Sequence, residues 1–61
     1  MHPITKYRKA LGWSQSELAR RSGVHCTTIS QIEGDKLKPY PSQLKKLADA
    51  LDVKIIDLQV A

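Results

Sequence analysis

The sequence is poor in cysteine and has no long hydrophobic run. Its 61 residues include a single cysteine, Cys26, so no disulfide can form within the chain. Because stable disulfides mark oxidising compartments, a reducing cytoplasm is the default expectation. Unbroken apolar runs reach only two or three residues, far short of the roughly 20 that a membrane-spanning helix needs. We therefore expect a soluble, cytoplasmic protein with no membrane partner.

Signals for secretion and catalysis are also missing. The N-terminal residues lack the apolar core of a secretory signal, so we expect a complete cytoplasmic unit. The sequence offers no Ser/His/Asp set, carboxylate pair or glycine-rich phosphate loop, which argues against an enzyme and against a bound cofactor. His25 and Cys26 are neighbours, but adjacent helical residues point about 100° apart and no third ligand is near, so we expect no metal site. A redox role for Cys26 is an alternative to its being simply a small side chain on the outward face of its helix.

We expect the 61 residues to form one domain, residues 1–61. Charge is unevenly distributed along this domain. The net charge is +4. Residues 1–48 hold nine of the ten Lys and Arg residues against three acids, whereas residues 49–61 hold one Lys against three acids. A basic body with a mildly acidic end favours a polyanionic partner such as nucleic acid. A solvated, lysine-rich surface is the alternative interpretation.

Local sequence signals predict the first two helices. Apolar residues from Ile4 to Leu11 recur at helical spacing and predict a first helix. Ser14, with Glu17 three residues later, matches the capping box that starts a helix. Gly23 is expected to end this second helix, because a left-handed residue after a helix carries little strain when it lacks a Cβ.

A third helix is predicted over residues 26–33, before Gly34. Its β-branched residues are poor helix formers in isolation, so tertiary packing must hold it. We expect Ile29 and Ile32 to point inward. Short hydrogen-bonding side chains lie toward the other side, where a solvated helix would more often carry lysine and glutamate. Threonine and glutamine can read the edges of bases. This outer side comprises Cys26, Thr27, Ser30 and Gln31.

The C-terminal part of the sequence is less clear. Pro41 suits the first turn of a fourth helix. Beyond that helix, the alternation of apolar residues from Ile56 to Val60 would suit a strand, whereas Ile55 and Leu58 would share one face of a short helix. We predict a short fifth helix. The expected fold class is therefore all-α, a compact bundle of five short helices.

The spacing within the second and third helices is the most specific pattern. Ala19 is small enough for the two helices to cross closely, Gly23 makes the turn, and Ile29 and Ile32 fill the angle between them. From Ile4 to Leu58 the chain resembles the phage-repressor and Cro-type helix-turn-helix family, known as XRE. The resemblance rests on Ser14-Gln15-x-Glu17-Leu18-Ala19-x3-Gly23-Val24-x4-Ile29-x2-Ile32-Glu33 and on the later Pro39, Leu47-Ala48 and Leu51-x-Val53. It implies a lambda-repressor-like DNA-binding domain with its helix-turn-helix over about residues 14–33.

This resemblance implies contacts with double-stranded DNA. The third helix would lie in the major groove, with Gln31 the best candidate for bidentate pairing with adenine. Phosphate contacts are implied at the start of the second helix and in the loop after the third. A tolerated cap is the alternative for His25, and packing on the loop is the alternative for Tyr40. The implied base-reading residues are Cys26, Thr27, Thr28 and Gln31, and the phosphate-binding candidates are Ser14, Gln15, His25, Lys36, Lys38 and Tyr40.

Two further expectations concern the end of the third helix. The resemblance implies a structural ion pair between Arg8 and Glu33. The family usually has Glu-x-Gly here, but Gly34 precedes Asp35 in this chain, so the path of the following loop is open.

The favoured function is a sequence-specific DNA-binding transcriptional regulator that acts as a repressor. The alternative is an antitoxin or protein-interaction module with the same fold. One short recognition helix reads too few base pairs to select a genomic site, so we expect a weak homodimer on a near-palindromic operator. The predicted dimer contacts are the apolar C-terminal residues Ile55, Ile56, Leu58 and Val60.

Overall fold

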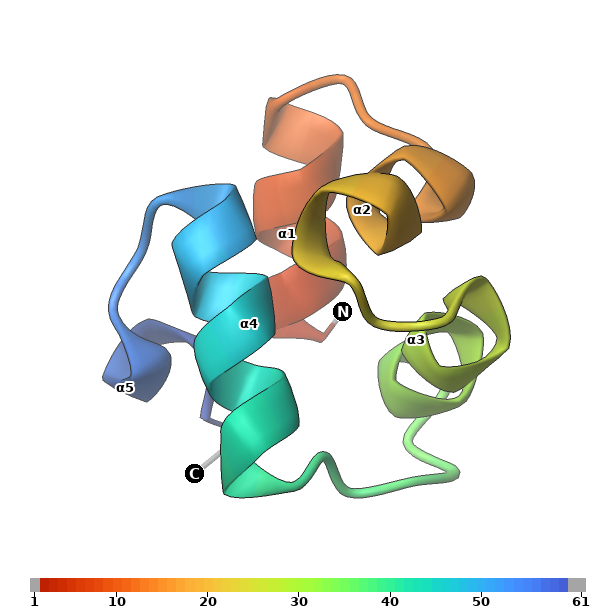
Figure 1. Cartoon of the computed structure of the whole chain (residues 1–61), viewed down its shortest axis with the longest axis vertical. Coiled ribbons are helices and arrows are strands. Elements are labelled where there is room, and N and C mark those ends of the chain that lie inside the picture. Colours follow the sequence, from red (N-terminus) through yellow and green to blue (C-terminus); the bar gives the residue numbers. More distant parts are fainter. Residues whose placement is uncertain (1, 60–61) are drawn as a thin grey trace.

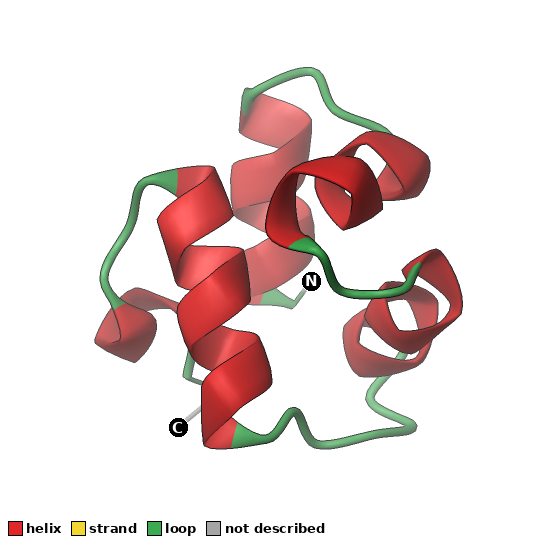
Figure 2. Cartoon of the chain, in the orientation of Figure 1, coloured by secondary structure: helices red, strands yellow, loops and turns green. Residues whose placement is uncertain are grey.

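The computed structural model describes residues 2–59 and is helical wherever it has regular secondary structure (Figure 1, Figure 2). No strand occurs within that range, so the all-α prediction is confirmed, and the C-terminal segment forms a short helix rather than a strand. The helices are α1 (Pro3–Ala10), α2 (Gln15–Ser22), α3 (Cys26–Glu33), α4 (Pro41–Leu51) and α5 (Ile55–Leu58). None of the helices in this part of the chain is both long and apolar enough to span a membrane.

The start of α2 differs in one respect from the predicted capping box. Ser14 Oγ accepts a hydrogen bond from the backbone N–H of Glu17 at 3.1 Å, as the box requires. The Glu17 carboxylate forms ion pairs with Arg20 and Arg21 instead of returning to the Ser14 backbone. Two guanidinium groups, three and four residues along the same helix, attract the carboxylate away from the cap. Only half of the box is therefore formed.

Both histidines cap a helix. His2 Nδ1 accepts the backbone N–H of Ile4 at 3.1 Å at the start of α1. His25 Nδ1 accepts the backbone N–H of Thr27 at 3.1 Å at the start of α3. An Nδ1 that accepts a hydrogen bond carries no proton, so in each neutral ring Nε2–H is the donor. Capping by His25 was the alternative to a phosphate contact at this position.

Two left-handed residues direct the chain around α3. Gly23 ends α2 with φ of 76°, and its N–H donates to the Ala19 carbonyl at 2.9 Å, as expected from the helix-turn-helix pattern. After α3, Gly34 has φ of −87°, which any residue adopts, whereas Asp35 has φ of 58°. Aspartate is one of the few residues with a Cβ that visits this region readily. The left-handed residue of the loop after α3 is therefore Asp35, one position after Gly34.

The hydrophobic core joins all five helices, with α4 packed against α1, α2 and α5. Leu58 is 1% exposed and completes this core from α5. Its prediction as a dimer contact is therefore wrong, because a side chain that closes the core of its own chain has no free surface for a partner. The largest fully buried side chains are Ile4, Leu18, Ile29, Ile32, Leu47 and Leu58.

Candidate nucleic-acid interface

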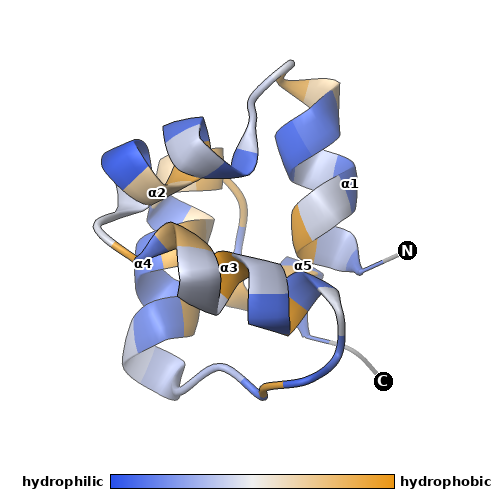
Figure 3. Cartoon of the chain, turned by 90° about the vertical axis from the view of Figure 1, so that its right-hand side faces the viewer, coloured by the Kyte–Doolittle hydropathy of each residue, from blue (hydrophilic) through white to orange (hydrophobic). Residues whose placement is uncertain are grey.

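The outer face of α3 is polar and uncharged. Ile29 and Ile32 are completely buried, which orients the opposite side of the helix toward solvent, where it lies across the front of Figure 3. Thr27 and Gln31 are exposed, as base-reading residues would need to be. The other two predicted base readers, Cys26 and Thr28, are half-buried at the edges of this face.

Ser30 was not among the predicted base-reading residues, yet it is exposed beside them. Residues three and four apart on a helix are neighbours, so Thr27, Ser30 and Gln31 form one surface. Helical spacing in the sequence had already placed Ser30 on this outer side, although the family resemblance did not include it among the base-reading residues.

A buried ion pair removes the one charge of α3 from its outer face. Arg8 Nε donates to Glu33 Oε2 at 2.9 Å, and Arg8 Nη2 donates to Glu33 Oε1 at 3.0 Å. The two side chains are only 10% and 8% exposed. Arg8 also donates to the Trp13 carbonyl at 2.7 Å. This arrangement ties α1 to the end of α3 and to the segment that leads into α2.

Gln15 is the third member of this network. Its Nε2 donates to Glu33 Oε1 at 3.1 Å, across 18 positions of sequence. The side chain was predicted to meet phosphate, but it is half-buried and one amide hydrogen is used inside the protein. A phosphate contact at Gln15 would therefore use its second amide hydrogen or its backbone N–H, which lies in the first turn of α2.

The environment of Glu33 keeps its carboxylate ionised. Burial raises the pKa of this carboxyl group, whereas hydrogen bonds from Arg8, Gln15 and Thr5 lower it by more. The pKa of Glu33 therefore lies below its ordinary value. At neutral pH the carboxylate is an acceptor that holds Arg8 and Gln15 in place.

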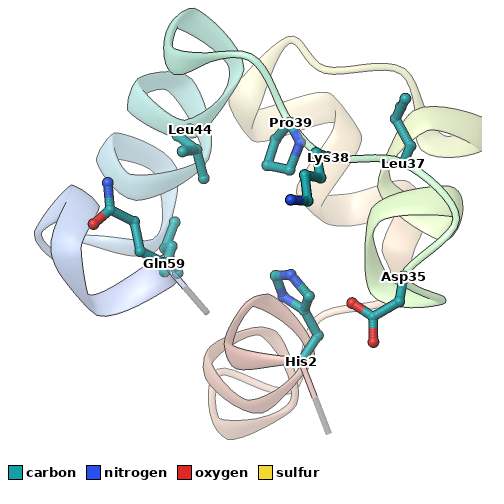
Figure 4. Close-up of a pocket in the computed structure, with 8 residues that line it drawn as sticks. His2, Asp35, Leu37, Lys38, Pro39, Leu44 and Gln59 are labelled. Carbon is teal, nitrogen blue, oxygen red and sulfur yellow. The ribbon is translucent and has the colours of Figure 1, made fainter. Parts of the chain in front are cut away.

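The loop after α3 carries two lysines in different surroundings. The backbone N–H of Lys36 donates to the Gln31 carbonyl at 2.9 Å, so the chain at Lys36 folds back onto the end of α3. Lys38 is also exposed, but its side chain lines a hollow between this loop and the start of α1 (Figure 4). The two lysines therefore do not share one environment.

The other phosphate-binding candidates are all at the surface. Ser14 and His25 are exposed at the N-termini of α2 and α3, and each uses one acceptor atom as a cap. Tyr40 is 68% exposed, and its backbone N–H donates to Gln43 Oε1 at 3.0 Å at the start of α4. Its hydroxyl is therefore accessible to a partner.

The predicted dimer residues divide between core and surface. Ile56 is 70% exposed and Ile55 is 39% exposed on α5, whereas Leu58 belongs to the core. Val60 lies outside the described residues. In Figure 1, α5 lies across the molecule from α3, with α4 and α1 between them. The exposed isoleucines are therefore separate from the polar face of α3.

Comparisons with known proteins identify the family. A family model described as helix-turn-helix matches residues 4–58, which confirms the resemblance to the phage-repressor and Cro-type proteins. A protein of Neisseria meningitidis serogroup B, named Neisseria hypothetical transcription factor, is 38% identical over 52 residues. The alignment covers 85% of the chain and 49% of that relative, so the chain spans about half of its length. No solved structure gave a significant match.

Proposed function

The chain belongs to the helix-turn-helix family, and we propose that it is a sequence-specific DNA-binding transcriptional regulator that reads the major groove with α3. The observation that carries this proposal is the outer face of α3. It combines hydroxyl and amide groups with no exposed charge, because Arg8 holds the Glu33 carboxylate away from that face. A face without a free carboxylate can approach the phosphate backbone without repulsion.

Gln31 and Thr27 are the proposed centre of base recognition. A glutamine amide can pair with both the N6 and N7 atoms of adenine, and a threonine offers a hydroxyl and a methyl group in the major groove. Cys26 and Thr28 are half-buried and would contact bases at the edges of the same surface. A good bidentate contact contributes about 1–3 kcal/mol of discrimination against a wrong base.

Phosphate contacts would fix the orientation of α3 in the groove. Backbone N–H groups at the N-termini of α2 and α3 provide a partial positive charge for them. The free Nε2–H of His25 is a further donor at the start of α3. The complete proposed phosphate-binding set is Ser14, Gln15, His25, Lys36, Lys38 and Tyr40.

The proposed operator is a near-palindrome bound by two copies of the chain. Two recognition helices would then lie about 34 Å apart, one helical turn of DNA. The exposed Ile55 and Ile56 are the described residues that would form the weak contact between copies. Occupancy of such a site blocks other proteins, which supports a repressor, and a regulator of cytoplasmic DNA would itself act in the cytoplasm.

In vitro selection from a pool of random duplexes tests this function. The chain is expected to enrich a near-palindromic sequence whose half-sites are about one helical turn apart. A pool that keeps its random composition after several rounds, despite retention of DNA by the protein, would contradict sequence-specific recognition. In that case binding would be limited to the sequence-independent attraction of phosphates.

A further inference from the structure

The hollow at the N-terminal end of α1 has a volume of about 440 Å³ (Figure 4). It is lined by the residue before α1, the loop from α3 to α4, Leu44 of α4 and the end of α5. Small-molecule sites in proteins range from about 300 to 1,000 Å³. The hollow is thus large enough for a small organic molecule.

Part of the wall is apolar. Leu44 of α4 and Leu58 of α5 come from the body of the protein, and Leu37 and Pro39 come from the loop. Leu58 is only 1% exposed, so the apolar surface that is open to a ligand belongs to Leu44, Leu37 and Pro39. An aliphatic group placed there would remove apolar surface from water.

Two hydrogen-bond donors point into the same hollow. Figure 4 shows the Lys38 ammonium and the His2 ring directed toward its centre. His2 Nδ1 accepts the N–H of Ile4, so its Nε2–H is the donor that the ring offers. Between residues 2 and 59, no carboxylate lies within ion-pairing distance of Lys38. These donors fit a ligand carboxylate.

A carboxylate of the protein also lines the hollow, that of Asp35. A simple anion would be attracted by Lys38 and repelled by Asp35. A ligand with both an ammonium and a carboxylate group satisfies both side chains. An apolar wall beside charges of opposite sign therefore favours a zwitterion with an aliphatic body.

We propose that this hollow binds an α-amino acid with an aliphatic side chain. Its carboxylate accepts hydrogen bonds from Lys38 and His2, and its ammonium group donates to Asp35. Its side chain packs against Leu44 and Pro39. For so small a ligand, a dissociation constant of about 1–10 mM is expected.

Binding at this site also affects DNA, an extension that rests on the proposed function. Lys38 is a proposed phosphate contact, and a ligand carboxylate at Lys38 competes with phosphate for the same ammonium group. The amino acid therefore acts as an inducer that weakens DNA binding.

Amide NMR spectra of the full chain with four probes test the site without DNA. L-Leucine is expected to shift the signals of Lys38, Leu44 and Gln59 saturably. 4-Methylpentanoate lacks the ammonium, 3-methylbutylamine lacks the carboxylate, and glycine lacks the aliphatic body. Each is expected to bind about tenfold more weakly than leucine or worse. No saturable shift with leucine, or equal affinity for all four probes, would overturn the proposal.

Matched variants identify the charged groups. Lys38→Gln should remove the preference of the hollow for leucine over 3-methylbutylamine, whereas Lys36→Gln, which changes the other lysine of the loop, should leave it intact. Asp35→Asn keeps a residue that tolerates the left-handed backbone and should remove the preference for leucine over 4-methylpentanoate. An equal effect of the two lysine variants would overturn the assignment of Lys38.

The effect on DNA is measured separately. Saturating leucine should weaken operator binding, and glycine at the same concentration serves as the control for ionic and solvent effects. Leucine that binds in the NMR experiment but leaves operator affinity unchanged would overturn the role as inducer. Saturable leucine binding by a chain that shows no sequence-specific DNA binding would instead contradict the proposed function and leave the amino-acid site in place.

Discussion

At the scale of single residues, one carboxylate connects much of the fold. Glu33 accepts two hydrogen bonds from Arg8 and one from Gln15, and these groups come from α1, α2 and the end of α3. A paired charge in a poorly hydrated site is stable only while its partner is present, because the remaining charge would otherwise be buried alone. The position of α3 relative to α1 and α2 therefore depends on this residue.

Glu33→Ala is expected to destabilise the protein by about 3–5 kcal/mol, since it leaves Arg8 buried without its partner. A domain of this size is held by only about 3–9 kcal/mol, so the variant is expected to lose a large part of its stability. Urea denaturation followed by circular dichroism measures the loss. Glu17→Ala is the matched control, because its carboxylate also pairs with arginines but is at the surface. Equal midpoints for the two variants would contradict a structural role of the buried pair.

Stability should fall in acid because of the lowered pKa of Glu33. The unfolded chain binds a proton at higher pH than the folded chain does, so this contribution is complete above the ordinary glutamate pKa of 4.5. It is lost as pH decreases through the folded-state pKa. NMR titration of the side-chain carboxyl carbons should give Glu33 a midpoint below 4.5. High salt should leave that midpoint nearly unchanged, because the pair is buried. A midpoint at or above the ordinary value would contradict the network.

At the scale of helices, the two glycines of the helix-turn-helix region have different roles. Gly23 has φ of 76°, so a Cβ there is strained even though the surrounding space is open. Gly34 has an ordinary φ, and an added Cβ would lie 3.4 Å from the nearest atom, the Ser30 carbonyl oxygen. The left-handed turn after α3 is made by Asp35 instead.

The two glycines should therefore respond oppositely to alanine. Gly23→Ala should destabilise the protein by about 1 kcal/mol, the cost of a left-handed residue with a Cβ. Gly34→Ala should stabilise it by about 0.4–1 kcal/mol, because alanine restricts the unfolded chain. Thermal unfolding of both variants beside the parent gives the two signs. A loss of stability in Gly34→Ala as large as that in Gly23→Ala would show that the loop needs glycine at position 34.

Sequence patterns predicted features set by neighbouring residues. The spacing of apolar residues gave the helices and the inward direction of Ile29 and Ile32, and Gly23 marked the turn. The sequence did not show which partner the Glu17 carboxylate would take. The backbone N–H of Ser14 and the guanidinium groups of Arg20 and Arg21 were all close to it along the chain, and the carboxylate pairs with the two arginines. The predicted dimer role of Leu58 failed because a short apolar segment carries too little pattern to show which residues the core takes.

Contacts between distant parts of the chain were predicted only where a family resemblance supplied them. The resemblance implied the partnership of Arg8 with Glu33, but the hydrogen bond from Gln15 to the same carboxylate joins residues 18 positions apart and has no local signal. The hollow beside Lys38 is likewise formed together by the residue before α1, the loop from α3 to α4, α4 and the end of α5. Such features depend on how the helices pack, which spacing along one helix does not specify.

At the scale of the whole molecule, the polar face of α3 and the exposed isoleucines of α5 lie on different sides. This separation allows one surface to contact DNA while the other contacts a second copy. Ile56 is 70% exposed, and a single side chain of this size supports only a small interface. Pairing is thus expected to depend on the DNA that holds two copies together.

Ile56→Glu should abolish cooperative filling of a palindromic site, because a charge would be desolvated at the contact between copies. Binding to a single half-site and the melting temperature should change little. Gln59→Glu adds the same charge at an exposed polar position near the same helix and should keep cooperativity. Titrations of one-site and two-site duplexes measure the difference. Cooperative filling by Ile56→Glu equal to that of the parent would place the contact elsewhere.

The most direct test of base recognition by α3 is the DNA affinity of Gln31→Ala, measured by fluorescence anisotropy at one fixed salt concentration. Each protein is titrated with the selected operator and with a shuffled duplex of the same composition. Loss of the proposed adenine contact should weaken operator binding by about 1–3 kcal/mol and leave binding to the shuffled duplex nearly unchanged. Gln59→Ala, which removes an exposed glutamine outside α3, should match the parent on both duplexes. Equal losses on the two duplexes, or no loss on the operator, would contradict base reading by α3.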